Sequence, residues 1–310
     1  MIKKLCKGLV FALCLGMTTS ALAASLHPIQ GRPETTPANM LPKQEYTLNK
    51  VVQVFGRQGV CTDGEYYWVS GSKTLTKYDK NWKEVARNTT PFEGYEIPAN
   101  HIGDIDVYNN EIYVGAENFV DGVGKDIQIA VHDANTLKLK RTFKFAPESG
   151  QEECAGITVN PDEKTVWLCS WVGEESGRYL YEYDLETGKF LRKVHLQAPP
   201  QWVQGLVYYN GSYYLTADDG TADMREPDHI YRVDIRPGAT NANVVLERTL
   251  DDVKFQGEIE GLTVNHKTNQ LLVHYNRGSR IVLGMVKGFY PGYDKEISED
   301  FIYDMQKARH

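Results

Sequence analysis

The sequence predicts an all-β fold built from repeated four-stranded antiparallel units, that is, a β-propeller. A turn residue, a β-rich run, a tight turn and a second aromatic or β-branched run occur in this order five times, starting at Gln58, Gly103, Ala155, Gln204 and Glu260. The anchor residues Gly59, Asp104, Gly156, Gly205 and Gly261 are spaced 45, 52, 49 and 56 positions apart. A period of about 40–50 residues with several strands per unit is typical of propeller blades.

Each copy continues into a second hairpin, which supplies the two outer strands of a blade. The outer turns are rich in Asp, Asn and Gly, which favour tight turns, and alternating strands follow at 137–145, 189–196 and 243–250. The segment Tyr46–Val54 resembles these fourth strands, so we expect it to close the last blade. In that blade the third strand is expected at 281–286, and the tail 297–307 is the one candidate for a short helix. The spacing predicts five blades, with six as the alternative.

The N-terminus has the pattern of a secretory signal peptide. Three lysines at positions 3, 4 and 7 precede an apolar stretch from Leu9 to Met17, and an Ala-x-Ala site ends at Ala23. The apolar stretch is too short to span a bilayer as a helix. We therefore expect a signal peptide at 1–23, an extended segment at 24–44 and a single propeller domain at 45–310. The product would be periplasmic or secreted, with a retained N-terminal anchor as the alternative.

Composition narrows the range of partners. The formal net charge is −7, and three of the lysines belong to the predicted leader. A nucleic-acid partner or an anionic membrane surface requires basic patches, so neither is expected. The 19 tyrosines and 5 tryptophans suit pleated strands. A small molecule, a glycan or another protein remains as the partner, and the sequence does not specify an oligomeric state.

Three cysteines remain outside the leader, at positions 61, 154 and 169. If Val159 and Lys164 flank the Asn160–Glu163 turn as a pair, Cys154 and Cys169 face each other across a hairpin. A disulfide between them would persist in an oxidising compartment. The alternative is two buried free thiols, because a small slip in strand register separates the two cysteines.

Loop length separates the two rims of the predicted propeller. The turns within each hairpin are short, whereas the connections between blades and between the second and third strands are long and irregular. Function concentrates on long loops held by a rigid scaffold. We therefore expect one working rim, where each first strand begins and each second strand ends near the central channel.

Carboxylates and amides from several blades are predicted to meet at this working rim. Oxygen ligands gathered in this way suit Ca²⁺ or a similar divalent cation, and a histidine among them widens the choice toward Mn²⁺ or Zn²⁺. The predicted metal ligands are Glu117, Asn118, Asp218 and Glu260, followed by His101. The alternative is a water-filled channel that is lined by polar side chains and holds no metal.

Aromatic and polar side chains at the same rim form the predicted ligand-binding set. Three of them, Trp171, Trp202 and Tyr275, are candidates for a platform under a sugar or another planar ligand. Gln204 lies at the start of a first strand, and Arg277 is a candidate clamp for a carboxylate or phosphate. The alternative is that the aromatic rings pack between blades and the arginine makes a surface salt bridge.

Two blade starts resemble those of a known superfamily. Glu260-Gly261-Leu262-Thr263 and Ala155-Gly156-Ile157-Thr158, each followed by a turn and an aromatic-rich strand, are similar to blade starts in the gluconolactonase, strictosidine-synthase and phytase-like group of calcium-dependent propellers. The resemblance implies a metal in the central channel, often held by a glutamate of an early blade, and hydrolysis of lactones or esters at the loop-rich rim. By position, the role of metal ligand carries over first to Glu260 and then to Glu117.

Two functions from different classes follow. The first is an exported propeller whose polar, acidic face at the central channel binds a ligand, with or without a divalent cation. The alternative is a metal-dependent hydrolase of a lactone, ester or phosphoester, in which His101 or Glu153 is the general base. No organic cofactor is indicated, because no Gly-rich phosphate loop occurs. The Gly-x-Ser-x-Gly motif of serine hydrolases is also missing.

Overall fold

The computed structural model describes residues 40–120, 123–144, 146–171, 175–221, 224–282 and 285–310. These residues belong to one compact unit, Gly31–His310, and the predicted signal peptide lies outside them. The fold is all-β, as predicted. Among the described residues the two named helices are the single 3₁₀ turns η2 (Pro147–Ser149) and η3 (Ser176–Arg178), and no helix is long and apolar enough to cross a membrane.

Four successive segments of the chain each form four consecutive antiparallel strands. The first contains β2 (Val60–Thr62), β3 (Tyr67–Gly71), β4 (Thr74–Tyr78) and β5 (Glu84–Asn88), and the second contains β6 (His101–Tyr108), β7 (Glu111–Val120), β8 (Val123–Asp133) and β9 (Leu139–Lys144). The third contains β10 (Ile157–Asn160), β11 (Thr165–Leu168), β12 (Tyr179–Asp184) and β13 (Phe190–Gln197), and the fourth contains β14 (Val203–Tyr209), β15 (Ser212–Ala217), β16 (His229–Val233) and β17 (Asn241–Thr249).

The hairpin turns show why these residues fold locally as they do. Asn109 and Asn110 connect β6 to β7 with φ of 50° and 61°, and Asn210 and Gly211 connect β14 to β15 with φ of 47° and 80°. Two successive residues with positive φ form the type I′ turn, whose twist matches that of antiparallel strands. Asparagine and glycine tolerate this conformation best, so the turns set the register of the inner hairpins.

The third and fourth segments join into one eight-stranded sheet. Their outer strands β13 and β17 pair in parallel, with His195 opposite Asn241 and Gln197 opposite Asn243. The repeat pattern did not predict this pairing, because it describes each blade separately and not contacts between the outer strands of two blades.

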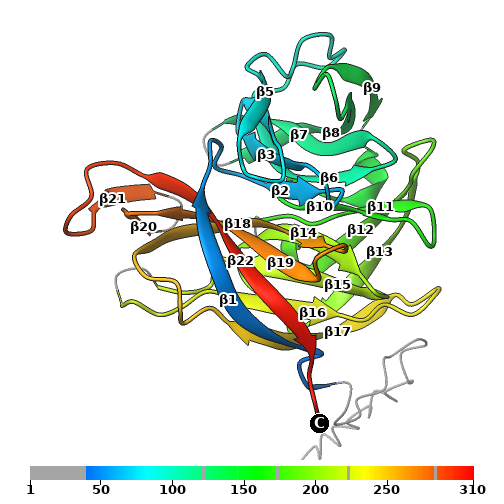
Figure 1. Ribbon diagram of the computed structural model, residues 1–310. Coiled ribbons are helices and arrows are strands. Elements are labelled where there is room, and N and C mark those ends of the chain that lie inside the picture. The colour runs from blue at the N-terminus through cyan, green and yellow to red at the C-terminus, as the bar shows by residue number, and fades with distance from the viewer. Residues whose placement is uncertain (1–39, 121–122, 145, 172–174, 222–223, 283–284) are drawn as a thin grey trace, which may run out of the picture. The chain divides into compact units, whose positions relative to one another are not determined.

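The N-terminal strand closes the last sheet, as predicted. β1 (Gln44–Gln53) pairs antiparallel with β22 (Ile297–Lys307), next to β19 (Gln270–Arg277) and β18 (Gln256–Asn265). Figure 1 shows β1 in blue alongside β22 in red. Two expectations for this region are wrong. The tail 297–307 is a strand rather than a helix, and it replaces 281–286 as the third strand of the sheet. The chain at 279–289 instead forms a separate hairpin of β20 (Ser279–Val282) and β21 (Met285–Phe289).

Hydrophobic packing links the successive sheets. Four of five buried clusters lie between two groups of strands that are neighbours in the chain, and the fifth cluster joins the last group to the first. In that fifth cluster, Leu272 and Ile302 pack with Val60 and Val69. The inner strands also contact one another in sequence, from β2 to β6, β10, β14 and β18, and β18 returns to β2. The core is therefore distributed over the interfaces between sheets.

The five anchor residues of the repeat meet where the inner strands converge. A Cβ atom on Gly261 would lie 2.1 Å from Asp104 Oδ1 and 2.7 Å from the Cα of Gly59, and one on Gly205 would lie 2.7 Å from the Cα of Gly261. Glycine is thus required by close backbone approach at these positions. Asp104, the exception in the repeat, fills the remaining space. Its carboxylate accepts N–H bonds from Ile105 at 2.8 Å and from Leu206 at 3.1 Å.

The predicted disulfide between Cys154 and Cys169 is not formed. Both cysteines are buried free thiols, as is Cys61. The hairpin register differs from the assumed one, since Val159 is opposite Val166 and not Lys164. Cys169 consequently exchanges backbone hydrogen bonds with Ala155 and Gly156. The two-residue shift in register moves Cys154 away from the position opposite Cys169.

Candidate functional site

The long connections hold two tryptophans against each other. Trp171 follows β11 and Trp202 precedes β14, and their ring centroids are 4.8 Å apart at an angle of 41°. Trp202 has a φ of 55°, an uncommon conformation for a bulky residue, and its carbonyl accepts the N–H of Asp218 at 2.9 Å. Backbone strain of this kind persists where the surroundings impose it, and it clusters at binding and active sites.

A hydrogen bond to Glu153 holds Trp171 in place. The buried Glu153 carboxylate accepts the backbone N–H of Trp171 at 2.5 Å, and the Glu153 carbonyl accepts the Ser170 hydroxyl at 2.6 Å. Among the described residues, the buried indole N–H of Trp171 has no hydrogen-bond acceptor. Glu153, predicted as a general base, therefore positions the tryptophan in this structure.

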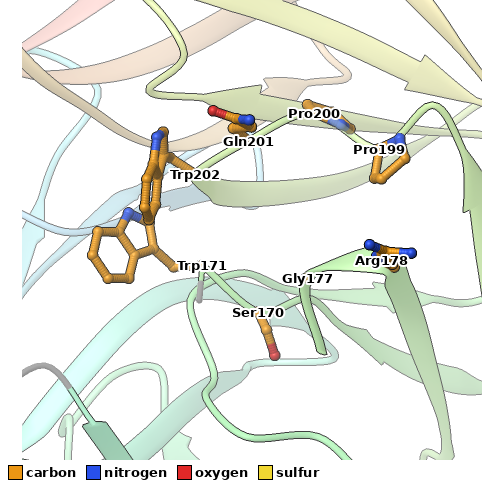
Figure 2. Close-up of a pocket in the computed structure, with 8 residues that line it drawn as sticks. All are labelled: Ser170, Trp171, Gly177, Arg178, Pro199, Pro200, Gln201 and Trp202. Carbon is orange, nitrogen blue, oxygen red and sulfur yellow. The ribbon is translucent and has the colours of Figure 1, made fainter. Parts of the chain in front are cut away.

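A cleft of about 340 Å³ opens on one side of the tryptophan pair. Its other walls are Ser170, Gly177, Arg178 and the segment Pro199–Gln201. Figure 2 shows the two indole rings at one end of this cleft and Arg178 with Pro199 at the other. Two prolines and two indole rings give the cleft stiff apolar walls, and Arg178 and Gln201 supply polar groups.

A second hollow, of about 210 Å³, shares Trp171, Gln201 and Trp202 with the first. Its walls also include the carboxylates of Asp218, Asp219 and Asp228, and the apolar side chains of Ile281 and Val282 from β20. We call this second space the acidic hollow. The tryptophan pair is thus a common wall between a cleft with an arginine and a hollow with three aspartates.

Burial and mutual repulsion dominate the electrostatics of the acidic hollow. Burial raises the pKa of Asp228 to about 7, although its carboxylate accepts bonds from the Gly220 N–H at 3.0 Å and the Tyr275 hydroxyl at 3.2 Å. The pKa of Asp218 lies well above its usual range, because of burial and then the charges of Asp228 and Glu258. Burial and the neighbouring carboxylates both favour the protonated form of these carboxyl groups.

Asp219 is held by its neighbours on β16. Its two carboxylate oxygens contact His229 Nδ1 at 2.8 Å and the Tyr231 hydroxyl at 2.5 Å. Both oxygens of the Asp219 carboxylate therefore have a partner within the protein.

A network of charged side chains lies next to the acidic hollow. Arg57 bonds to Glu258 and to Glu296 at 2.8 Å each, and Gln204 donates to Glu258 at 3.2 Å. Glu260 accepts the Asn276 side-chain amide at 2.8 Å, and burial followed by the Glu258 charge raises its pKa well above the usual range. Gln204 and Glu260 thus lie in the predicted region, as supports of the network.

His101 and Glu117 form a separate pair at the start of β6. His101 Nδ1 lies 3.4 Å from Glu117 Oε1, and neither atom has a hydrogen-bond partner among the described residues. Burial, and then the Arg57 charge, lowers the pKa of His101 to about 4, and burial raises the pKa of Glu117 to about 8. Both side chains are therefore uncharged at neutral pH.

The remaining predicted site residues are engaged elsewhere. Tyr275 is 0% exposed and supports Asp228 through its hydroxyl, so its ring is not a platform. Arg277 pairs with Glu299 and donates to the Lys254 carbonyl at 2.9 Å. Asn118 is paired with Lys125 along the β7–β8 ladder.

The predicted calcium ligands do not form a cluster. In the part of the chain that the structure describes, no three His, Cys, Asp or Glu side chains gather closely enough to hold a metal ion. The Asp218 charge contributes to the raised pKa of Glu260, after burial and the Glu258 charge, whereas Glu117 is paired with His101. The calcium site stays a prediction and forms no part of the function proposed below.

Three residues of the site were missed at the level of sequence. Asp228 ends the acidic connection 218–228 immediately before β16, and Arg57 precedes the first inner strand. Both occupy strand starts at the working rim, the same criterion that pointed to Gln204. No sequence pattern pointed to Gln201, which lies in the loop between β13 and β14.

Comparison with known proteins gave structural likenesses only. No protein-family model and no curated protein sequence matches the chain. Hydrazine synthase from Kuenenia stuttgartiensis has a TM-score of 0.45 and 10% identity, over 86% of this chain and 67% of that one. A PQQ-bound aldose sugar dehydrogenase from Streptomyces coelicolor has 0.45 and 10%, over 84% and 98%. A gluconolactonase from Xanthomonas campestris has 0.45 and 11%, over 78% and 68%.

Proposed function

We propose that the chain is an exported five-bladed β-propeller that binds a small organic ligand against Trp171 and Trp202. The five interfaces between successive sheets and the return of β18 to β2 support five blades. Export follows from the leader pattern at 1–23.

The tryptophan pair carries the proposal. Two indole rings from different segments form the shared wall of two hollows of about 340 and 210 Å³, and the larger of the two is in the size range of small-ligand pockets. Rigid aromatic side chains bury a large area at low entropic cost and are typical of energetic hot spots. Trp171 lines both hollows and has a buried indole N–H with no acceptor among the described residues, so a bound ligand with an acceptor group would satisfy it.

Calorimetric titration with a panel of sugars, organic amines, organic acids and lactones tests this function. Trp171→Ala and Trp202→Ala are expected to weaken the binding of any member at least about tenfold. The control is Trp82→Ala. Trp82 also has a positive φ of 62° and stacks on Tyr67 at 4.1 Å, but it lies in the β4–β5 turn. Equal loss in the control, or no loss in either site variant, would contradict the proposal.

Hydrolysis is the second candidate function, and the acidic hollow is the observation that favours it. A carboxyl group with a pKa of about 7, as in Asp228, suits general acid–base chemistry at neutral pH, and Asp218 lies beside it. The lactones of the panel address this function directly, because turnover would appear as a continuing heat signal rather than a saturating one.

A further inference from the structure

The described lining of the acidic hollow contains the carboxyl groups of Asp218, Asp219 and Asp228 and no lysine or arginine. We propose that the ligand bound against Trp171 and Trp202 carries an organic ammonium group and places it in the acidic hollow. This inference rests on the function proposed above and specifies the chemistry of its ligand.

The wall of the hollow has the composition that recognises organic cations. The faces of indole rings attract a cation that lies within about 6 Å of the ring, and this is how proteins bind quaternary ammonium groups. Trp171 and Trp202 provide two such rings at an angle of 41°. Ile281 and Val282 add apolar surface on another side, which suits the methyl or methylene groups around the nitrogen.

The charges of the hollow have one sign. Its described lining includes Asp218, Asp219 and Asp228 and contains no lysine or arginine. The hydrogen bonds to Asp228 come from a backbone N–H and a tyrosine hydroxyl, which are neutral donors. The raised pKa values of Asp218 and Asp228 have the same origin, because each carboxylate faces other carboxylates in a buried place. A cation in the hollow would remove this repulsion.

The geometry favours an ammonium over a metal ion. A metal requires several oxygen or nitrogen donors converging at about 2.0–2.6 Å, and no such group of three is present among the described residues. An organic ammonium spreads its charge over a larger volume and accepts separated carboxylates and ring faces as partners. On the other side of the tryptophan pair the charge is opposite, since Arg178 lines the first cleft.

Calorimetry with choline and its neutral isostere 3,3-dimethyl-1-butanol tests the inference on the unmodified mature chain. The two molecules have nearly the same shape and differ in charge. Choline is expected to bind at least about tenfold more tightly than the isostere. Because a cation lowers the pKa of nearby carboxyl groups, choline binding near pH 6 should also release protons. The observed heat should then depend on the ionisation enthalpy of the buffer.

Substitutions test whether the preference for choline over its isostere arises in the acidic hollow. Asp218→Asn is expected to weaken choline binding about tenfold and to leave the isostere unchanged. Asp162→Asn is the control for net charge. Asp162 is exposed in the β10–β11 turn, where its carboxylate accepts the Tyr208 hydroxyl, and its loss should change neither affinity.

The outcomes separate this inference from the function on which it rests. Equal affinity for choline and the isostere, or no choline binding up to about 10 mM, would overturn the ammonium assignment. If Trp171→Ala still weakens binding of uncharged panel members, the aromatic site stands without it. If the tryptophan substitutions change no binding at all, both proposals fail together. The comparison of choline with its isostere uses the unmodified chain, so it decides the question even if Asp218→Asn does not fold.

Discussion

Asp104 shows how one residue can complete a contact that four glycines leave open. The other anchors are glycines because their Cα atoms meet too closely for a side chain. Asp104 places its carboxylate in the space that this leaves and accepts backbone N–H groups of Ile105 and Leu206. Buried N–H groups without an acceptor are costly, so the aspartate satisfies donors that a fifth glycine would leave unpaired.

Substituting Asp104 tests this role. Asp104→Asn turns one acceptor oxygen into an NH₂ group facing a backbone N–H, and we expect the free energy of unfolding to fall by about 1–3 kcal/mol. Asp104→Gly restores the repeat pattern but should be at least as destabilising, because it removes both acceptors. Urea denaturation followed by circular dichroism measures both values. An Asp104→Gly variant as stable as the native chain would show that the glycine pattern alone suffices.

At the scale of elements, the closing strand β1 depends on one buried ion pair. Glu247 and Arg232 are both 0% exposed and lie 2.6 Å apart. Glu247 also accepts the backbone N–H groups of Lys43 and Gln44 at 2.9 Å each, and Arg232 donates to the Leu41 carbonyl at 2.9 Å. The pair therefore holds the start of the strand that completes the last sheet.

Glu247→Gln should loosen this closure. Removing one partner of a buried ion pair costs up to about 3–5 kcal/mol, and Arg232 keeps its contact with Asp234 at 3.3 Å, which offsets part of this loss. We expect faster hydrogen exchange at the amides of 44–53 and of β22, with a smaller change in β6 and β7. Glu84→Gln is the control, since Glu84 pairs with Arg87 at an exposed position. Uniform acceleration across all sheets, or none in β1, would contradict the assignment.

The sequence predicted the elements best where the pattern is local. The repeats located the inner hairpins, and Tyr46–Val54 was correctly placed as the closing strand. The tail 297–307 was misread because its mixed charged and apolar residues fit a helix as well as a strand, and pairing on both sides with β1 and β19 decides between them. The prediction of the disulfide was wrong because of strand register. A two-residue shift after Asn160 changes the residue that faces each position of the hairpin.

At the scale of the whole molecule, strand order predicted which connections lie on one rim but not the chemistry of that rim. Strand order placed Trp171, Trp202, Asp218 and Glu260 on connections of one kind, and in the structure both tryptophans line two hollows, one of which Asp218 also lines. The roles of Tyr275 and Glu153 as buried supports depend on side-chain packing, which no spacing rule contains. The proposed function therefore depends on the wall formed by Trp171 and Trp202. This wall combines aromatic surface, the strained backbone of Trp202 and the neighbouring carboxyl groups of the acidic hollow.

The indole N–H signals of the chain test that claim most directly. The chain has 5 tryptophans, and Trp68 and Trp167 already donate to the Ala134 carbonyl and the Thr165 hydroxyl at 2.9 Å each. In a ¹⁵N-edited NMR titration with the panel member that binds most tightly in calorimetry, the account predicts that the indole signals of Trp171 and Trp202 move together, while those of Trp68, Trp82 and Trp167 stay in place. Movement confined to the other three tryptophans, or no movement of the Trp171 and Trp202 signals, would contradict it.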